Sequence, residues 1–394
     1  MFLLAEKTNT DSLKKMPITY FIYNAISEIP ASIFQNNSNP YLSFEYLQLL
    51  EVENSSIGMR YIVINEGNEC IAVAVIQILS IKLSAPYNPT VECFIMKEVI
   101  LQLSKFGLKK LHKILVCGNI FIAGENGFLL MKPENDNFTD YFASVLEKAL
   151  KDIAKHENAN LILFKDFRNM KDAVPQMLQQ KNYRNVSTEP AMVLTIDESW
   201  KTFDDYLLAM KTKYRTKAKK ALTESAVLVV KDLNYNDIMQ NINEFSSLYE
   251  NVENKASFSL GRLNLATYIS MKQKFPEKFI FKSYSFNNKI VGFMTAFQNN
   301  NSLDAHYIGL DYEVNKELYL YQRILYDYVE VAIERGLKYV NYGRSAGEIK
   351  SSVGAMPIDL FCCMKHLSVF HNTFLKPLVE GIKPNNFKIT LPFK

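Results

Sequence analysis

The sequence predicts an α/β protein made of two tandem units, each a mixed, mostly antiparallel sheet with flanking helices. The chain has 394 residues, of which 48% are hydrophobic, enough for two domains that each bury a core. A strand–turn–strand pattern occurs twice, at residues 60–80 and 279–298. Each copy is followed by a further strand, an amphipathic helix and a last strand, so the same order of elements is written twice.

The first copy starts with β-branched residues on either side of the turn residues 66–68, a pattern typical of a hairpin. A further strand is expected within 113–124. Apolar residues then recur at helical spacing before an apolar run at 161–164 that reads as a buried strand. The helical positions are Phe142, Val145, Leu146, Leu150 and Ile153.

The second copy has the same order of elements, with Asn287 and Asn288 at the turn of its hairpin. A strand is expected over 302–312, and a helix should follow that Gly336 ends. The last strand is expected at 339–342. The buried stripe of the helix comprises Leu320, Ile324, Leu325, Tyr328, Val331 and Ala332.

The boundary between the copies is expected near residue 198. Residues 183–200 end the first copy with a strand, and Asp197 or Ser199 is placed to cap a long helix over 200–225. We therefore expect an N-terminal domain at 1–198 and a C-terminal domain at 199–394, with the active site in the second.

Composition and charge restrict the classes of function and the cellular location that the sequence predicts. A net charge of +4 is too small to indicate DNA binding, although it allows a local basic surface. The five cysteines, Cys70, Cys93, Cys117, Cys362 and Cys363, have no C-x-x-C spacing, so we expect reduced thiols and no metal site. Apolar runs are too short for a signal peptide or a transmembrane segment, which predicts a cytoplasmic protein.

Two stretches carry a resemblance to a known family. The run "KTKYRTKAKKA" opens the second copy and "GLKYVNYGRSAGEIKSSVGA" lies near its end. With the repeated order of elements, these stretches resemble the FemAB-like and BioF2-like branch of the GNAT acyltransferase superfamily, most strongly over 201–360. The resemblance implies that two neighbouring parallel strands, here within 303–310 and 338–343, part and present main-chain N–H groups to the carbonyl of an acyl donor.

The resemblance implies an N-acyltransferase that moves an acyl group from an acyl thioester to an amine by direct attack. The donor would be acyl-CoA or an acyl-carrier protein, and the acceptor a small-molecule or cell-envelope precursor amine. One alternative is a FemAB-type transferase that uses aminoacyl-tRNA on a peptidoglycan precursor, and another is a non-catalytic binding protein on this fold. The segment "DYEVNKELYLYQ" lacks the glycine-rich loop that binds the pyrophosphate of coenzyme A in many GNAT enzymes, although a helix N-terminus there still offers N–H groups to an anion.

The basic run supplies two candidate substrate-binding residues, Lys213 and Arg215. On a helix whose inward stripe includes Leu207, Ala218 and Ala221, the cations fall on the remaining surface. They form either a solvated face or a patch for a phosphate-rich substrate.

Polar residues on the predicted strand 302–312 supply further candidates. Alternation places Asp304 and His306 on one face and Tyr307 on the other. His306 is either a structural histidine or the base that takes a proton from the attacking ammonium. Asp304 and Tyr307 are candidate substrate-binding residues beside it.

The stretch 341–357 is expected to form a loop at the end of the last strand. Its glycines allow close approach of backbone to a ligand, and Arg344 and Glu348 are candidate substrate-binding residues. In the related families a lysine near this position matters, and by motif that lysine is Lys350. Tyr342 is a candidate proton donor, although it is one of 22 tyrosines and a core position is the alternative.

Overall fold

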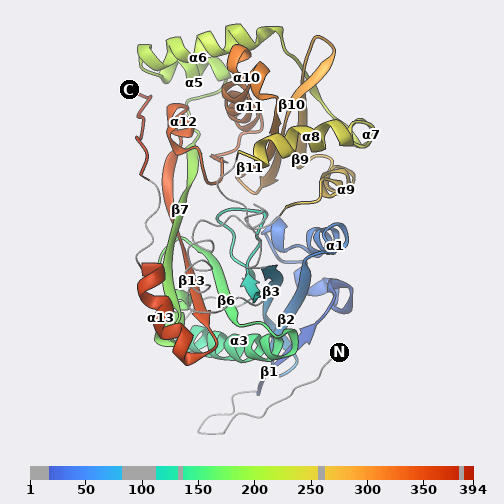
Figure 1. The fold of residues 1–394 in the computed structure, drawn as a ribbon, viewed down its shortest axis with the longest axis vertical. Helices are drawn as coiled ribbons and strands as arrows, with labels where there is room; N and C mark the ends of the chain where they lie inside the picture. Colours follow the sequence, from blue (N-terminus) through green and yellow to red (C-terminus); the bar gives the residue numbers. More distant parts are fainter. Residues whose placement is uncertain (1–16, 82–111, 132–135, 256–261, 381–385) are drawn as a thin grey trace. The chain divides into compact units, whose positions relative to one another are not determined.

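The computed structural model describes residues 17–81, 112–131, 136–255, 262–380 and 386–394, and these residues form two compact units (Figure 1). Unit 1 comprises the described residues of Met1–Thr188, Phe258–Arg262 and Leu360–Pro384, and unit 2 comprises those of Glu189–Ser257, Leu263–Asp359 and Asn385–Lys394. Two of the boundaries between the units fall inside strands, β7 (Arg184–Thr195) and β13 (Met356–His366). Unit 1 includes Leu360–Pro384, whereas the sequence-based division at residue 198 places that segment in the second domain.

Unit 1 is a mixed, mostly antiparallel sheet in the order β1-β2-β3-β4-β6-β13. Only the β4–β6 pair among these is parallel, and β5 pairs with β3. The strands are β1 (Ile18–Tyr23), β2 (Gly58–Glu66), β3 (Glu69–Ile81), β4 (His112–Cys117), β5 (Phe128–Leu130) and β6 (Leu161–Phe167), and the helices are α1 (Phe44–Glu53), α3 (Asp136–Glu157), α4 (Ala173–Gln180) and α13 (Val369–Glu380).

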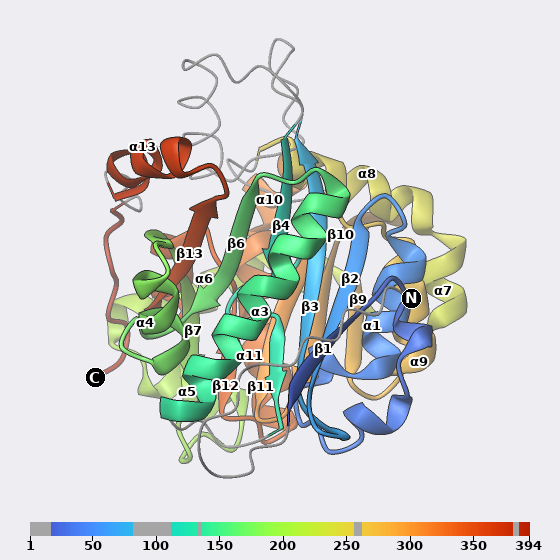
Figure 2. The ribbon, with the colours of Figure 1, turned by 90° about the horizontal axis from the view of Figure 1, so that it is seen from below.

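The core of unit 1 lies between its sheet and α3. Figure 2 shows α3 lying across the sheet, and the predicted stripe positions Phe142, Leu146, Leu150 and Ile153 are all buried there. β6 is buried along its whole length, as its unbroken apolar start predicts for a central strand covered on both faces.

Unit 2 repeats this arrangement with the order β7-β12-β11-β10-β9-β8, in which β11 and β12 are the parallel pair. The strands are β8 (Val229–Asp232), β9 (Phe279–Phe286), β10 (Lys289–Asn299), β11 (Ser302–Leu310) and β12 (Tyr339–Asn341), and the helices are α5 (Phe203–Ala209), α6 (Thr212–Glu224), α7 (Tyr235–Gln240), α8 (Ile242–Glu253), α9 (Ala266–Lys274), α10 (Tyr312–Leu318), α11 (Leu320–Glu334) and α12 (Gly347–Ser352). The predicted fold class is therefore confirmed.

Helices cover both faces of the second sheet. On one face α11 packs with α5 and α6 in a core that contains all six residues of its predicted stripe. On the other face Phe245 of α8 contacts Phe281 and Phe293 from the central hairpin, with ring centroids 4.8 and 5.4 Å away. β10 and β11 are thereby held between two apolar layers.

The turns follow local sequence as predicted. Asn287 and Asn288 both have positive φ, 49° and 62°, as the two-residue turn of a right-twisted hairpin requires. Gly67 has φ 61° in the first hairpin, and Gly336 has φ 63° after α11. These positions suit asparagine and glycine because the left-handed region is costly for other side chains.

One predicted helix is interrupted. The helix over 200–225 is broken at Met210, whose ψ is 145°, and Met210 forms an isolated β-bridge with Phe393 near the chain end. Its first half is capped by Thr202 through a capping box with Asp205, so the expectation that Asp197 or Ser199 caps this helix is wrong. The predicted helix that Gly336 ends is α11, and a separate short helix, α10, precedes it, with Tyr319 at φ 52° between the two.

Within the described ranges, no helix has both the length and the apolarity needed to cross a bilayer. Cys70, Cys117, Cys362 and Cys363 are free thiols. The fifth cysteine, Cys93, lies outside the described residues.

Candidate active site

The two parallel strands of unit 2 part after three residue pairs. β11 and β12 are paired only from Ser302–Tyr339 to Asp304–Asn341. Beyond that point β11 continues along β10 to Leu310, while the chain after β12 follows β7, with the Tyr342 N–H donating to the Met192 carbonyl at 2.9 Å. Each strand thus stays with its outer neighbour.

A β-bulge lies on β11 just beyond this point. Met294 pairs with Ile308 and Ala296 with Ala305, so His306 and Tyr307 together oppose Thr295. The Thr295 hydroxyl accepts from the Tyr307 N–H at 3.1 Å and donates to its carbonyl at 2.8 Å. Strict alternation predicts opposite faces for His306 and Tyr307, and that expectation is wrong because a bulge inserts one extra residue. Both rings lie against Tyr268 of α9.

His306 sits in an apolar, aromatic setting formed by Tyr268, Phe279 and Phe297, with ring centroids 6.2–6.4 Å away. Burial lowers the pKa of His306 to about 3, because an apolar environment disfavours the charged imidazolium. A group that weakly basic is a poor acceptor for an ammonium proton at neutral pH. The structure therefore argues against His306 as the base.

Asp304 and Tyr307 also make contacts that hold the fold together. Asp304 is buried and accepts hydrogen bonds from the Ser302 hydroxyl at 2.7 Å and the Asn299 amide at 3.1 Å. The Tyr307 ring packs edge-on against Tyr249 at 5.2 Å. Neither belongs to the described residues that line the large cavity of unit 2.

That cavity has a volume of about 920 Å³ and lies beside the end of β12, within the range of small-molecule and cofactor sites. Its walls come from β7, α6, the α10–α11 junction, α12 and the last residues of the chain. The described lining residues are Glu189, Pro190, Met192, Tyr214, Lys217, Lys220, Ala221, Tyr319, Gln322, Tyr326, Ser345, Ala346, Gly347, Glu348, Ile349, Ser352, Phe387 and Thr390.

The stretch expected to be a loop, 341–357, includes a short helix, α12, that forms one wall of the cavity. Ser345 and Ala346 precede it with φ of 61° and 50°, a left-handed conformation that costs alanine or serine free energy and is typical of functional segments. Gly347 lies so close to Phe387 that a Cβ on it would be 2.4 Å from the ring. The chain end thus closes over α12.

Lys350 lies on α12 and is 6% exposed. Its Nζ donates to the carbonyls of Tyr342 at 2.7 Å and Arg344 at 2.6 Å, the residues that follow β12 where the strands part. Burial lowers the pKa of Lys350 to about 7, and the charge of Glu189 opposes that shift. A buried lysine whose charge changes near neutral pH is a candidate functional group.

Tyr342 is a core residue. It is 5% exposed, its ring packs edge-on against Tyr328, and its hydroxyl donates to the Leu325 carbonyl at 3.0 Å. Burial raises the pKa of Tyr342 well above its ordinary value. This placement favours the packing role and not the proposed proton donor.

We expect the Tyr342→Phe variant to retain acyl transfer within about twofold in kcat, because the hydroxyl is already engaged inside the core. Its free energy of unfolding should fall by about 1 kcal/mol, the net value of one hydrogen bond. Urea denaturation and initial rates on the same preparation check both. A loss of turnover of a hundredfold or more without unfolding would restore Tyr342 as a catalytic group.

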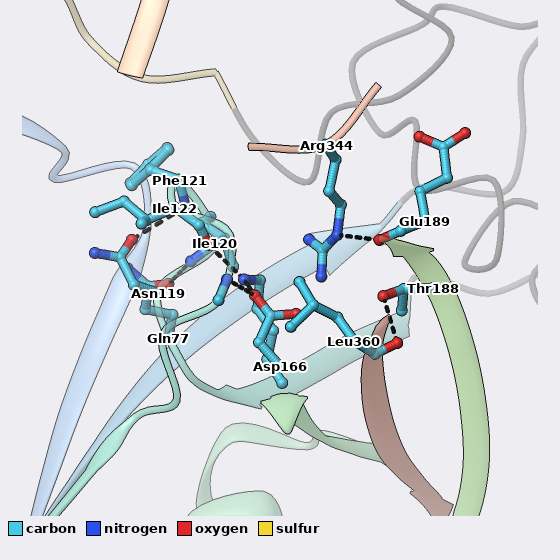
Figure 3. Close-up of polar contacts among 12 residues, drawn as sticks. Gln77, Asn119, Ile120, Phe121, Ile122, Asp166, Thr188, Glu189, Arg344 and Leu360 are labelled. Carbon is cyan, nitrogen blue, oxygen red and sulfur yellow. Dashed lines mark hydrogen bonds and ion pairs between the residues drawn. The ribbon is translucent and has the colours of Figure 1, made fainter. Parts of the chain in front are cut away.

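The charged residues of the stretch 341–357 have different surroundings. Figure 3 shows the Arg344 side chain reaching the main chain of Glu189, to whose carbonyl its Nε donates at 3.1 Å. Glu348 is exposed and lines the cavity, as does Glu189. Arg344 thus ties the segment after β12 to β7, and the two glutamates place negative charge on that side of the cavity.

The basic helix α6 presents different cations from the predicted ones. Lys217 and Lys220 line the cavity, whereas Lys213 and Arg215 are not among its described lining residues. Arg215 donates to the Leu208 carbonyl at 3.3 Å, and Lys213 lies 5.8 Å from the ring of Tyr214. The rotation of the helix is set by buried Ala218 and Ala221, so the lysines next to that stripe point to the cavity.

In unit 1 the parallel strands β4 and β6 also part, after Cys117 and Phe164. There, a loop over 118–127 fills the space between the strand ends. Figure 3 shows this loop held by Gln77, Asn119 and Asp166. The Ile120 N–H donates to Gln77 at 2.8 Å and the Gly124 N–H to Asp166 at 2.9 Å. A cavity lined by this loop measures about 10 Å³, too small for a substrate.

A buried ion pair at the end of β6 also holds this loop. Lys165 and Asp166 pair with each other, and Lys165 also donates to the Ile122 carbonyl at 2.5 Å. This pair is not among the residues predicted from the sequence. Its signal was two opposite charges inside the apolar strand 161–167, where charges are rare unless paired.

The aromatic lining of the cavity, from Tyr319, Tyr326 and Phe387, was also not predicted from the sequence. Nothing in their spacing distinguishes them from core aromatics. In the part of the chain that the structure describes, no three His, Cys, Asp or Glu side chains are grouped as metal ligands.

The comparisons with known proteins cover most of the chain. A family profile described as FemAB-like, peptidoglycan biosynthesis/recognition, matches residues 124–379. Among curated proteins, no sequence matches significantly. The crystal structure of FemX is similar with a TM-score of 0.55 and 12% identity, covering 92% of this chain and 100% of FemX.

Other solved structures are similar at lower scores. A tandem GNAT protein from the clavulanic acid biosynthesis pathway has a TM-score of 0.48 and 7% identity, covering 89% of this chain and 99% of that one. L-PGS from Bacillus licheniformis has a TM-score of 0.45 and 10% identity, covering 85% and 92%. The likeness to FemX shows a common fold. Because the profile match spans more than half of the residues, this chain belongs to the FemAB-like family.

Proposed function

We propose that unit 2 transfers an aminoacyl group from aminoacyl-tRNA to an amine of a peptidoglycan precursor. The observation that carries this proposal is the cavity of unit 2, which Lys217 and Lys220 line and of which α12 forms one wall. α12 also carries the buried Lys350, which bonds to the main chain just after β12, where β11 and β12 part. Membership of the FemAB-like family supports the precursor as acceptor.

The parted strands suit acyl transfer. Attack of an amine on an ester carbonyl places negative charge on the carbonyl oxygen, and main-chain N–H groups held in fixed positions lower the free energy of that oxyanion. The segment 342–346 is held on both sides, by Lys350 through two carbonyls and by Arg344 through Glu189. Such fixed geometry is what electrostatic stabilisation of a transition state needs.

Lys350 is proposed to be the base. As a neutral amine it has two N–H bonds, which the carbonyls of Tyr342 and Arg344 accept, and its lone pair remains to accept a proton. The nucleophile forms a C–N bond to the carbonyl carbon and loses a proton to Lys350. The C–O bond to the tRNA ribose then breaks, and Lys350 returns the proton to the ribose oxygen.

The donor assignment is supported by the start of α10. In many GNAT enzymes a glycine-rich loop at this place binds the pyrophosphate of coenzyme A. Here the Asp311 carboxylate accepts from the N–H groups of Glu313 and Val314 at 3.1 and 3.5 Å. The Asp311 carboxylate already caps this helix, which leaves these N–H groups less available to a substrate anion and disfavours an ordinary coenzyme A site.

Transfer assays test the function. Purified protein is incubated with a muropeptide precursor and either charged tRNA carrying labelled amino acids or a pool of acyl-CoA and acyl-carrier-protein donors. We expect label on the muropeptide amine only with tRNA, and its loss after ribonuclease treatment. Thiol release without tRNA would overturn the aminoacyl-tRNA donor in favour of a thioester, and no transfer from any donor would overturn the proposed acceptor and support a binding role.

A further inference from the structure

We propose that Lys217 and Lys220 of α6, beside Tyr319 at the start of α11, bind a phosphate of the nucleotide portion of the donor. The inference deepens the proposed function and rests on it in that the donor carries a nucleotide. It assigns the anion to helix side chains in place of the glycine-rich loop that this chain lacks.

The two lysines belong to one stripe of α6. Tyr214, Lys217, Lys220 and Ala221 all line the cavity, a spacing of three or four residues that keeps them on one helix face. The rotation of α6 is fixed by Ala218, which is fully buried. The side chains of Lys217 and Lys220 therefore reach the cavity because of how the helix packs, and not by chance rotamers.

Charge is divided among the walls of the cavity. Lys217 and Lys220 come from α6, whereas its lining carboxylates, Glu189 and Glu348, come from β7 and α12. The Lys220 Nζ lies 5.5 Å from the centre of the Tyr319 ring, and the Tyr319 hydroxyl together with Glu224 raises the pKa of Lys220. An anion gains most at the α6 wall and is repelled by the carboxylate side.

The alternative anion site is already filled. The N–H groups that open α10 bond to Asp311, and the Tyr321 N–H in the first turn of α11 donates to the Asn315 side chain at 2.7 Å. These contacts use main-chain donors that otherwise attract phosphate. Lysine is an effective phosphate ligand as a point charge, so the α6 pair supplies the missing attraction.

Aromatic side chains in the same cavity indicate which phosphate-bearing group fits. Tyr214 of α6, Tyr319 between α10 and α11, and Tyr326 of α11 line it. Bases of single-stranded nucleic acid and of nucleotide cofactors stack on such rings, while lysines neutralise the adjoining phosphate. The 3′ end of tRNA and coenzyme A both carry a phosphate next to an adenosine.

Isothermal titration at low salt tests the site with two probes, the trinucleotide CCA and coenzyme A. Three proteins are compared: the wild type, the Lys217→Ala/Lys220→Ala variant, and a Lys213→Ala/Lys219→Ala control that removes the same charge from the same helix away from the cavity lining. We expect Kd for CCA to rise about tenfold or more in the cavity variant and to change less than about twofold in the control. The dependence of log Kd on log salt should also become shallower in the cavity variant only.

The outcomes separate this inference from the proposed function. Equal losses in both variants would show non-specific attraction to a basic helix and overturn the site, as would unchanged binding in the cavity variant or no binding of either probe to the wild type. Binding of coenzyme A alone, lost only in the cavity variant, would support the lysine site while overturning the tRNA donor. Thermal denaturation of all three proteins confirms that each is folded.

Discussion

Replacing Lys350 by methionine is expected to lower kcat/KM for acyl transfer by about a hundredfold or more while the protein stays folded, the range usual for loss of a general base. Methionine matches the length of the buried lysine stem and removes only the amine. Initial rates with saturating acceptor, together with circular dichroism of the same sample, measure both effects. The Lys219→Met variant, at an exposed position of α6, is the control and should keep full activity.

The pH dependence of the rate distinguishes a base from a packing residue. Because burial lowers the pKa of Lys350 to about 7, the neutral amine that accepts the proton becomes the main form above that pH. We expect kcat/KM of the wild type to rise by about tenfold in total between pH 6 and 8, with its midpoint near the pKa of Lys350, and this inflection to vanish in Lys350→Met. An identical profile in the variant would contradict the assignment.

The pH dependence of the free energy of unfolding is an independent test of the pKa of Lys350. In the unfolded chain the pKa of Lys350 returns to its ordinary value of 10.5, so between about pH 7 and 10.5 the unfolded state holds a proton that the folded state lacks. Stability therefore rises with pH in this window, by about 1.4 kcal/mol per unit from this group, and is flat below it. The difference in unfolding free energy between wild type and Lys350→Met should show this slope.

Replacing Gly354 by alanine is expected to destabilise the protein by about 2–5 kcal/mol. Gly354 has φ 97°, and a Cβ there would lie 2.2 Å from the Phe393 ring and 3.1 Å from Leu194. The left-handed backbone costs about 1–2 kcal/mol for alanine, and overpacking against a ring that also contacts Trp200 and Tyr206 adds about 1–3 kcal/mol. Urea denaturation measures the change.

Gly336 is the matched control for this substitution. It has φ 63° but nothing within 4 Å of its Cβ position, so Gly336→Ala should show the backbone cost alone, about 1–2 kcal/mol. Equal losses at the two positions would mean that Phe393 moves aside freely and that the chain end is not packed against α12 and β7 as described.

Much of the fold followed from local sequence. The paired asparagines 287 and 288, Gly336 after a helical stripe, and the apolar run 161–164 each depend on interactions within a few residues. The bulge on β11 was missed because its cause is a bond from Thr295 on the neighbouring strand. The break at Met210 was missed because its partner, Phe393, lies at the other end of the chain.

For the candidate site too, some features followed from local sequence and others depended on the tertiary structure. The motif around Lys350 and the basic run were recognised from the sequence, and both stretches contribute residues to the walls of the cavity. Which lysines of α6 face the cavity depended on the helix break at Met210 and on how Ala218 packs, and the aromatic lining came from three separate segments.

By itself, the sequence determined a duplicated α/β unit, its turns and the segments that carry charge, because these depend on side-chain periodicity and short-range backbone preference. Only the tertiary structure places His306 and Lys350 where burial lowers the pKa of each side chain, and places Tyr342 in the core. The reason is physical: a pKa and an orientation depend on burial and on neighbours distant in sequence, and no local pattern contains them.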